Sequence, residues 1–537
     1  MAAKKLGWLV LVTMFAVTAA PSCAGAADVS KIAEASWTEA RTDNFVVLTN
    51  AGEGRARYLI ENLEDFRRLV IEATNLDIES NPLPFHIVAL VGASQLKALI
   101  GTDNVFGAFQ QSYRGGLAAV NLTARAPDGT DSLQITYTAY GPIYRARQNT
   151  RTVGMDGVFH EYVHYLLEID AKRRYPLWFH EGYAEFLSTF DVSGDGRYKV
   201  GAPPMHRVLT LEKTRRIPIG SLLNARGYET GHGNSDFNAE SWLVVHYLMT
   251  DPDRRAKLYA FLDRLNTPMV DFVPAFEDVF GESIEDFSRH LRQYRRMARY
   301  GVERFERPAG PLPQPAIRVP PADEVREQLA YTLLHFSPVQ SKGVELLQSA
   351  IATNPGNMRA RALLAAVAIT NDDIAKAETI LAQAGPAADA DPDVASLRGE
   401  LDLRRAAELV SADKPGGEGF LAAATKSYRR ALAIDPDHAQ SLSGLARTWL
   451  IQPGRPPDEI IALVQRAQRL LPMNQEIELI AAHTHLKRGE IVDAVRSYEH
   501  VVAWGRDPVV VRQARERLEA IYAVAGDSLK QGLEATP

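Results

Sequence analysis

Short apolar runs bounded by turn residues characterise the chain from residue 27 to residue 150. Runs of this kind at 44–50, 85–91 and 116–122 predict three β-strands. Between the first two, apolar residues recur at the spacing of one helix face, which predicts a helix carrying Leu59, Leu63, Phe66 and Val70. The first part of the chain is therefore expected to mix strands and helix.

Apolar residues at helical spacing dominate residues 151–306, and this part is predicted to be mostly helical. A proline-rich segment follows at 307–322, with six prolines between Pro308 and Pro321. Proline fixes φ and lacks the backbone N–H that helices and sheets use, so this density favours an extended, semi-rigid linker. We expect a domain boundary there.

The last region, residues 323–535, is rich in Ala and Leu, and its pattern repeats. A usually small residue is followed four positions later by a large one, and three positions after that by another small one. The first residues of successive units lie 34, 47, 36 and 34 positions apart. The units are Gly343/Leu347/Ala350, Ala377/Leu381/Ala384, Ala424/Tyr428/Ala431, Ile460/Val464/Ala467 and Ala494/Tyr498/Val501.

This pattern resembles tetratricopeptide repeats, whose signature is matched in residue type by Ala424, Tyr428, Ala431 and Pro436. The resemblance implies an all-α solenoid of stacked helix pairs with a concave surface for a protein partner. The alternative is a generic Ala-rich helical bundle, which five units in register make less favourable.

Composition and charge narrow the class of protein. The formal net charge is −6, and Lys and Arg are spread along the chain rather than clustered. Nucleic-acid binding is therefore not expected.

The N-terminus has the features of a secretory signal peptide at residues 1–26. Lys4 and Lys5 precede an apolar run from Leu6 to Ala20, and small residues lead to a cleavage site after Ala26. The run is shorter than the ~20 residues of a spanning helix, which argues against a membrane anchor. We expect an exported chain, periplasmic or extracellular, with no membrane span after cleavage. A lipoprotein cleaved before Cys23 is a minor alternative.

The segment "HEYVHYLLEIDAKRRYPLWFHEGYAEF", residues 160–186, carries the candidate chemistry. His160 and His164 are four residues apart, so on a helix both imidazoles lie on one face and can bind one metal ion. Glu161 is placed to reach a water on that metal. The alternative is a pair of ordinary histidines on an amphipathic helix.

A catalytic zinc site needs three protein ligands, and cysteine cannot supply the third. Cys23 is the only cysteine, and it lies within the expected signal peptide. The remaining ligand must therefore be another histidine or a carboxylate.

The paired motifs resemble the gluzincin metallopeptidases, the thermolysin- and aminopeptidase-like branch of the zincins. In these enzymes a Glu on a later helix is often set in a W-[LF]-x-E-G-x-A-E context, which residues 178–185 match. The resemblance implies one Zn²⁺ per chain, held by His160, His164 and Glu181. Glu161 would be the general base that activates the zinc-bound water. Glu185 would orient a ligand histidine, unless it is an ordinary exposed helix residue.

His180 is a rival third ligand, but it projects about 100° away from Glu181 around a helix, and the family has a variable residue at this position. The chain departs from the family at the oxyanion-stabilising residue, because Asn238 stands where such proteins commonly have Tyr. Asn238, Tyr228 and His232 are the candidates for that function, and His246 is a further one that is better explained as structural. The family also binds substrate along an antiparallel edge strand, for which 116–122 is the candidate.

These features predict an α+β zincin-like metallopeptidase domain, in an N-terminal part (27–150) and a zinc-site part (151–306), followed by the tetratricopeptide solenoid. The expected function is an exported zinc peptidase whose repeats bind a protein partner. The alternative is a periplasmic repeat scaffold with a catalytically weak or inactive zinc domain.

Overall fold

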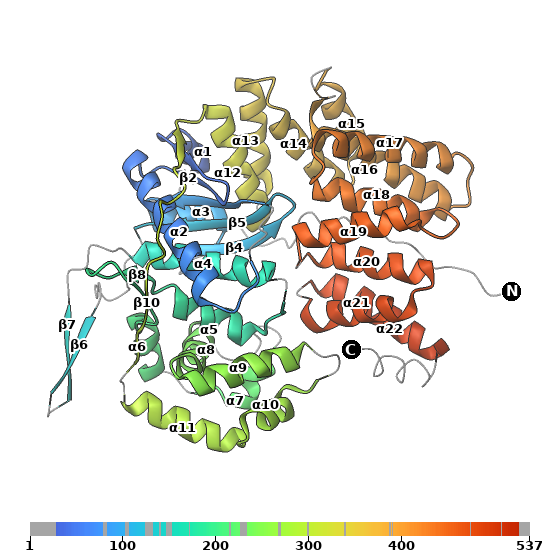
Figure 1. Ribbon diagram of the computed structural model, residues 1–537. Helices are drawn as coiled ribbons and strands as arrows, with labels where there is room; N and C mark the ends of the chain where they lie inside the picture. The colour runs from blue at the N-terminus through green and yellow to red at the C-terminus, as the bar shows by residue number, and fades with distance from the viewer. Residues whose placement is uncertain are drawn as a thin grey trace.

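The computed structural model describes residues 28–525, apart from 79–82, 103–106, 124–132, 139–140, 147–152, 171, 214–215, 226–233, 267–269, 298–299, 338–339, 386–387, 389, 473 and 506. The expected signal peptide, residues 1–26, lies outside this part of the chain. Figure 1 shows an N-terminal α/β region, a helical region that follows it, and an array of helix pairs along one side of both. Among the described residues, no helix combines the length and the hydropathy needed to cross a bilayer.

A six-stranded sheet forms the centre of the N-terminal region, in the order β11-β1-β2-β3-β5-β4. β2, β3 and β5 run parallel to one another, whereas β11, β1 and β4 are antiparallel to their neighbours. The three predicted strands are confirmed as β2, β3 and β5. The strands are β1 (Thr38–Arg41), β2 (Phe45–Thr49), β3 (Phe85–Leu90), β4 (Gly107–Ser112), β5 (Gly115–Asn121) and β11 (Ala316–Arg318).

The expectation that 116–122 lies at the sheet edge is wrong. This segment forms β5, which pairs with β3 on one side and β4 on the other. Its seven residues are all buried, as expected for an inner strand with a continuous apolar centre from Leu117 to Val120. Within the described residues the strand at this edge is β4, whose residues are mostly half-buried.

Helices cover both faces of the sheet because successive side chains of each strand point to opposite faces. On one face, Val47, Ile87 and Val120 pack against the long helix α2 (Glu53–Ala73), as the helical spacing predicted, and against α4 (Val153–Ile169). On the other face, the alternate strand residues pack against α1 (Val29–Ala33), α3 (Ala93–Ile100) and α12 (Ala322–Phe336).

The region that follows is mainly helical, as predicted. Two small sheets accompany it, β6 paired with β7 and β10-β9-β8. The elements are β6 (Leu133–Thr138), β7 (Gly141–Ala146), α4, α5 (Leu177–Leu187), β8 (Asp191–Val192), β9 (Tyr198–Val200), α6 (Met205–Lys213), α7 (Ile219–Leu223), α8 (Asn234–Met249), α9 (Pro252–Leu265), α10 (Phe272–Phe280), α11 (Ile284–Met297) and β10 (Glu303–Phe305).

The proline-rich segment contributes a strand to the central sheet. Between its prolines, Ala316–Arg318 form β11, which pairs antiparallel with β1 at the other sheet edge. Arg318 donates hydrogen bonds to the buried Glu39 carboxylate on β1, at 3.0 and 3.1 Å. Strand pairing and the Arg318–Glu39 hydrogen bonds thereby attach the linker to the central sheet.

The C-terminal region is a solenoid of helix pairs. The repeated residues inferred from the sequence lie on the second helix of each pair or directly after it, and all are buried. The packing is close: a Cβ at Gly444, for example, would overlap the Tyr428 ring. The helices are α12, α13 (Gln340–Thr353), α14 (Met358–Thr370), α15 (Ile374–Ala382), α16 (Pro392–Ser411), α17 (Gly417–Ile434), α18 (Ala439–Ile451), α19 (Asp458–Leu470), α20 (Gln475–Arg488), α21 (Ile491–Trp504) and α22 (Pro508–Ala525).

Candidate metal centre

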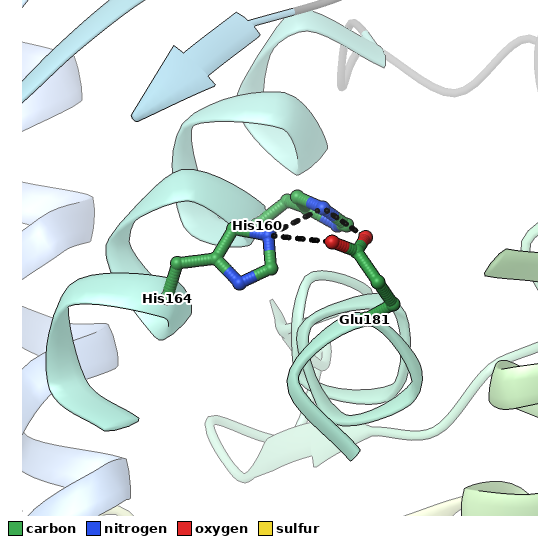
Figure 2. A group of neighbouring side chains, drawn as sticks. All are labelled: His160, His164 and Glu181. Carbon is green, nitrogen blue, oxygen red and sulfur yellow. Dashed lines mark hydrogen bonds and ion pairs between the residues drawn. The ribbon is translucent and has the colours of Figure 1, made fainter. Parts of the chain in front are cut away.

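Two neighbouring helices bring His160, His164 and Glu181 together (Figure 2). α4 carries both histidines one turn apart, and α5 carries the glutamate. One donor atom from each residue lies within 4.8 Å of the other two. The two Nε2 atoms are 3.1 Å apart, and the Glu181 carboxylate oxygens lie 3.6 Å from His160 Nε2 and 3.7 Å from His164 Nε2.

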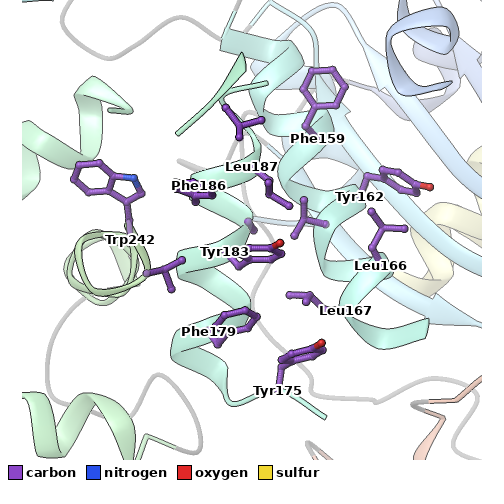
Figure 3. Close-up of a cluster of buried hydrophobic side chains, with 14 of the residues drawn as sticks. Phe159, Tyr162, Leu166, Leu167, Tyr175, Phe179, Tyr183, Phe186, Leu187 and Trp242 are labelled. Carbon is purple, nitrogen blue, oxygen red and sulfur yellow. The ribbon is translucent and has the colours of Figure 1, made fainter. Parts of the chain in front are cut away.

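Hydrophobic packing holds the two helices in this arrangement (Figure 3). Tyr162 and Leu166 of α4 are buried among apolar residues that include strand β2 and helix α5, while the ring of Phe179 stacks on Tyr183 along α5. Gly182 allows α5 to approach α8, because a Cβ at this position would collide with the Ser241 carbonyl oxygen and lie 2.6 Å from the Val245 side chain. The three polar donors therefore lie on helices that are packed closely among apolar side chains.

The donor set fits a zinc ion. Zinc binds His nitrogen and carboxylate oxygen at about 2.0–2.2 Å in a tetrahedron, whose ligand atoms are then roughly 3.3–3.6 Å apart, close to the observed separations. The surrounding charge also suits a cation. Burial alone would lower the pKa of His160, but the carboxylates of Glu181, Glu185 and Glu161 raise it to about 9.

Glu161 is buried close to His160, where edge strand β4 begins. A Cβ at Gly107, the first residue of β4, would lie 2.9 Å from the Glu161 side chain, so the strand and the carboxylate are in close contact. Burial raises the pKa of Glu161 to about 7, with His160 opposing the rise and Glu181 reinforcing it. A carboxylate tuned to this range can both accept and release a proton near neutral pH.

Glu185 lies one turn after Glu181 and is buried rather than exposed. Its Oε1 is 3.6 Å from His160 Nδ1 and accepts hydrogen bonds from Arg207 Nε and Nη2, at 2.8 and 2.6 Å. Burial alone would raise the pKa of Glu185, but Arg207, His160 and His206 outweigh it and lower the pKa to about 2. The resulting carboxylate faces the ring nitrogen of His160 that points away from the other two donors, as a group that orients a ligand would.

Asn238 has a contact that sequence reasoning missed. From α8 its Nδ2 donates a 2.8 Å hydrogen bond to Glu181 Oε2, so it holds the carboxylate of the third donor in place. The expectation that Asn238 stabilises an oxyanion has no support in this contact. Tyr228 and His232, the other candidates, lie outside the described residues. His246 is buried between Tyr294 and the Gly201 carbonyl, as a structural residue would be.

His180 does not join the three donors within 4.8 Å. It is buried on another side of α5, where its ring lies 5.9 Å from the His164 ring and 6.2 Å from the Tyr175 ring.

A second set of possible donors, His485, Glu490 and Asp493, lies where α20 meets α21. Arg488 donates a 2.7 Å hydrogen bond to Glu490 Oε1, and His485 Nδ1 lies 2.8 Å from Glu490 Oε2. The adjacent guanidinium already satisfies the carboxylate, so this set is a poor cation site.

Comparison with known proteins identifies the repeats. Residues 342–401 match the tetratricopeptide repeat family. No curated protein matches the chain. Among solved structures, it is similar to a thermophilic TPR protein in Thermus thermophilus, with 16% identity over 38% of this chain and 100% of the other, at a TM-score of 0.31. It is also similar to yeast Tom70, with 15% identity over 57% of this chain and 64% of the other, at a TM-score of 0.29.

Proposed function

We propose that this chain is an exported, zinc-dependent peptidase of the gluzincin type whose repeat array binds protein. The observation that carries the peptidase proposal is the convergence of His160, His164 and Glu181 beside the buried carboxylate of Glu161. A pure structural zinc site would have no use for that additional carboxylate. Export rests on the N-terminal sequence alone.

In this proposal His160, His164 and Glu181 hold one Zn²⁺, which would supply a Lewis acid for water and for the peptide carbonyl. Glu161, buried against the first residue of β4, accepts the proton of the attacking water and releases it to the leaving amine. Glu185 and Asn238 hold His160 and Glu181 in position.

Strand β4 is the place where an extended substrate would lie. It is at the sheet edge in the described part of the chain, and its first residue contacts Glu161. A peptide that adds to this edge as a further strand would bring a backbone carbonyl near the three donors.

A second function, a protein-binding scaffold with a weak or inactive zinc domain, is favoured by a different observation. The family match concerns the repeats alone, and tetratricopeptide arrays bind proteins on extended surfaces. Asn238 adds to this, because the chain has an amide where gluzincins have an acid-capable side chain. The tetratricopeptide repeat match supports protein binding more directly than it supports peptide hydrolysis.

The test compares the purified mature protein with Glu161→Gln, which keeps the side-chain shape but removes the base. Wild type should bind about one zinc per chain and cleave casein, whereas Glu161→Gln should retain the metal and lose at least about 100-fold in rate. Zinc is measured by mass spectrometry and cleavage by fluorescent product release. Glu72→Gln, an exposed change on α2, is the control.

Two results would redirect the proposal. A wild-type protein without bound zinc would contradict the metal site itself. Zinc in both proteins with cleavage by neither would favour the scaffold.

A further inference from the structure

The turn between β4 and β5 is built to present two side chains. Tyr113 and Arg114 form a two-residue loop between Ser112 and Gly115. Ser112 Oγ accepts a hydrogen bond from the Arg114 N–H at 3.2 Å and donates one to the Gly115 carbonyl at 2.8 Å. Gly115 has φ +105°, which other residues rarely adopt, and a Cβ there would lie 2.8 Å from the Pro84 carbonyl oxygen. The turn is therefore well fixed.

Arg114 binds two carboxylates from different repeats. Its Nη1 donates to Glu327 Oε1 of α12 at 2.8 Å, and its Nη2 donates to Asp393 Oδ2 of α16 at 3.0 Å. Its guanidinium also lies over the Tyr331 ring, 4.6 Å from the centroid. Burial alone would lower the pKa of Arg114, but Asp393 and Glu327 raise it above its ordinary value.

Tyr113 extends the contact further along the array. Its hydroxyl donates a 2.9 Å hydrogen bond to Glu476 Oε2 of α20. Its ring packs, together with Leu83, against a buried cluster from α18, α19 and α20 that includes Leu442 and Ile477. One two-residue turn thus touches helices from four of the helix pairs.

These helices share one face of the array. The first helices of successive pairs, α14, α16, α18 and α20, contact one another in a row, while α12 begins the row beside the sheet. We call the surface formed by Glu327, Tyr331, Asp393 and Glu476 the inner face. It is the surface on which a solenoid of this kind would bind a partner.

We infer that the inner face is a receptor for the β4–β5 hairpin of the same chain, and that this contact holds strand β4 against Glu161. The second half of the inference rests on the proposed function. The recognised element is an aromatic–arginine turn, and a partner protein using this face would have to present similar chemistry and displace the hairpin.

The geometry links the receptor to the candidate centre through six residues of one strand. At one end of β4 the turn is held by the array, and at the other end Gly107 touches Glu161. Between them, the Phe109 ring stacks 6.5 Å from the His164 ring. The array also reaches the loop between α4 and α5, where Arg174 Nη2 donates to the Pro472 carbonyl at 3.3 Å.

Hydrogen exchange of the full mature chain tests the inference, because it needs neither zinc nor activity. Arg114→Ala should speed exchange of the β4 amides about tenfold and leave α2 unchanged. Arg57→Ala, which removes an exposed ion pair with Glu53 on α2, is the matched control and should leave β4 unchanged.

A second measurement uses a labelled, cyclised peptide with the sequence of residues 109–118. It should bind Arg114→Ala, in which Glu327 and Asp393 have lost their arginine, at least tenfold more tightly than wild type. A peptide with alanine in place of its arginine should bind neither protein. If Arg114→Ala does not fold, Asp393→Asn provides the exchange test from the array side.

Unchanged β4 exchange in a folded Arg114→Ala protein, or equal peptide binding to both proteins, would overturn the inference. If both measurements succeed while wild type and Glu161→Gln prove equally inactive, the receptor stands and the proposed peptidase fails. If wild type is active, Arg114→Ala should keep its zinc and lose kcat/KM, because the strand that would bind substrate and contacts Glu161 has changed position while the three donors have not.

Discussion

The third donor of the candidate centre depends on a neighbour from another helix. The carboxylate of Glu181 can rotate about its side-chain bonds, and the hydrogen bond that Asn238 Nδ2 donates to Oε2 at 2.8 Å fixes its orientation. Groups that hold a metal ligand in this way typically contribute about 10–100-fold to metal affinity. Asn238→Ala should therefore weaken zinc binding by that factor while the fold is retained.

Competition with a chromogenic chelator measures this change, and Asn62→Ala on α2 is the control, since Asn62 bonds only the nearby Tyr58 carbonyl among the contacts described. Zinc affinity equal to wild type in Asn238→Ala would show that Glu181 needs no support from α8. An intermediate loss in Asn238→Asp is not expected, because a second carboxylate would repel Glu181 and deepen the loss.

The sequence allowed His160, His164 and Glu181 to be predicted because local spacing and one recognisable context were enough to place them. Arg207 and the actual contact of Asn238 could not be predicted in this way. Arg207 lies on α6 and reaches Glu185 only after the chain has turned back, and no spacing in the sequence encodes that approach. The available signal in the sequence was that Glu185, once buried, would need a cationic partner. That signal does not identify which arginine supplies it.

At the scale of elements, the strands with continuous apolar sequence were predictable, and those with mixed sequence were not. β5 is continuously apolar from Leu117 to Val120, and this pattern indicates a strand but also indicates an inner one. β4 contains Gln110 and Gln111, and β11 lies among prolines, so neither has a distinctive local pattern. Both are edge strands, and their pairing partners supply most of what makes them strands.

The contact between α5 and α8 also operates at the scale of elements. Gly182 lets the two helices approach, and Gly182→Ala would place a methyl group 2.6 Å from the Val245 side chain and against the Ser241 carbonyl. Overpacking of this kind costs about 1–3 kcal/mol of stability. Because α5 carries Glu181 and α8 carries Asn238, we expect zinc affinity to fall as well.

Gly54→Ala on α2 is the matched control, since a Cβ at Gly54 meets nothing within 4 Å. It should leave zinc affinity unchanged and raise helix stability by about 0.5–1 kcal/mol. Thermal unfolding and zinc competition on both variants compare the two glycines directly. Equal melting temperatures for Gly182→Ala and wild type would mean that α8 moves away at no cost.

At the scale of the whole molecule, the array and the sheet share a hydrophobic core. Val88 and Leu90 of β3 and Leu99 of α3 are buried in the same cluster as Val325 and Leu329 of α12. The first repeat helix therefore covers one face of the sheet, although the proline-rich segment separates the two in sequence. Figure 1 shows α12 and α13 next to the sheet, and the remaining helices of the array continue beyond them.

This shared core makes a prediction about truncation. A chain ending at residue 321 would expose the sheet face that α12 covers, and an apolar patch of that kind drives association. A chain ending at residue 355 keeps α12 together with α13, which packs against it. We expect the shorter chain to aggregate or lose its cooperative thermal transition, and the longer chain to remain soluble and folded.

Size-exclusion chromatography and melting followed by circular dichroism distinguish the two chains. A monomeric, cooperatively folded chain ending at 321 would show that the sheet is independent of the repeats. The longer chain separates two functions of the array, because it retains α12, and with it Glu327, but lacks Asp393 and Glu476. Its sheet should therefore be stable while β4 exchanges as fast as in Arg114→Ala, since burial of the sheet face needs only the first pair whereas the hold on the hairpin needs the later ones.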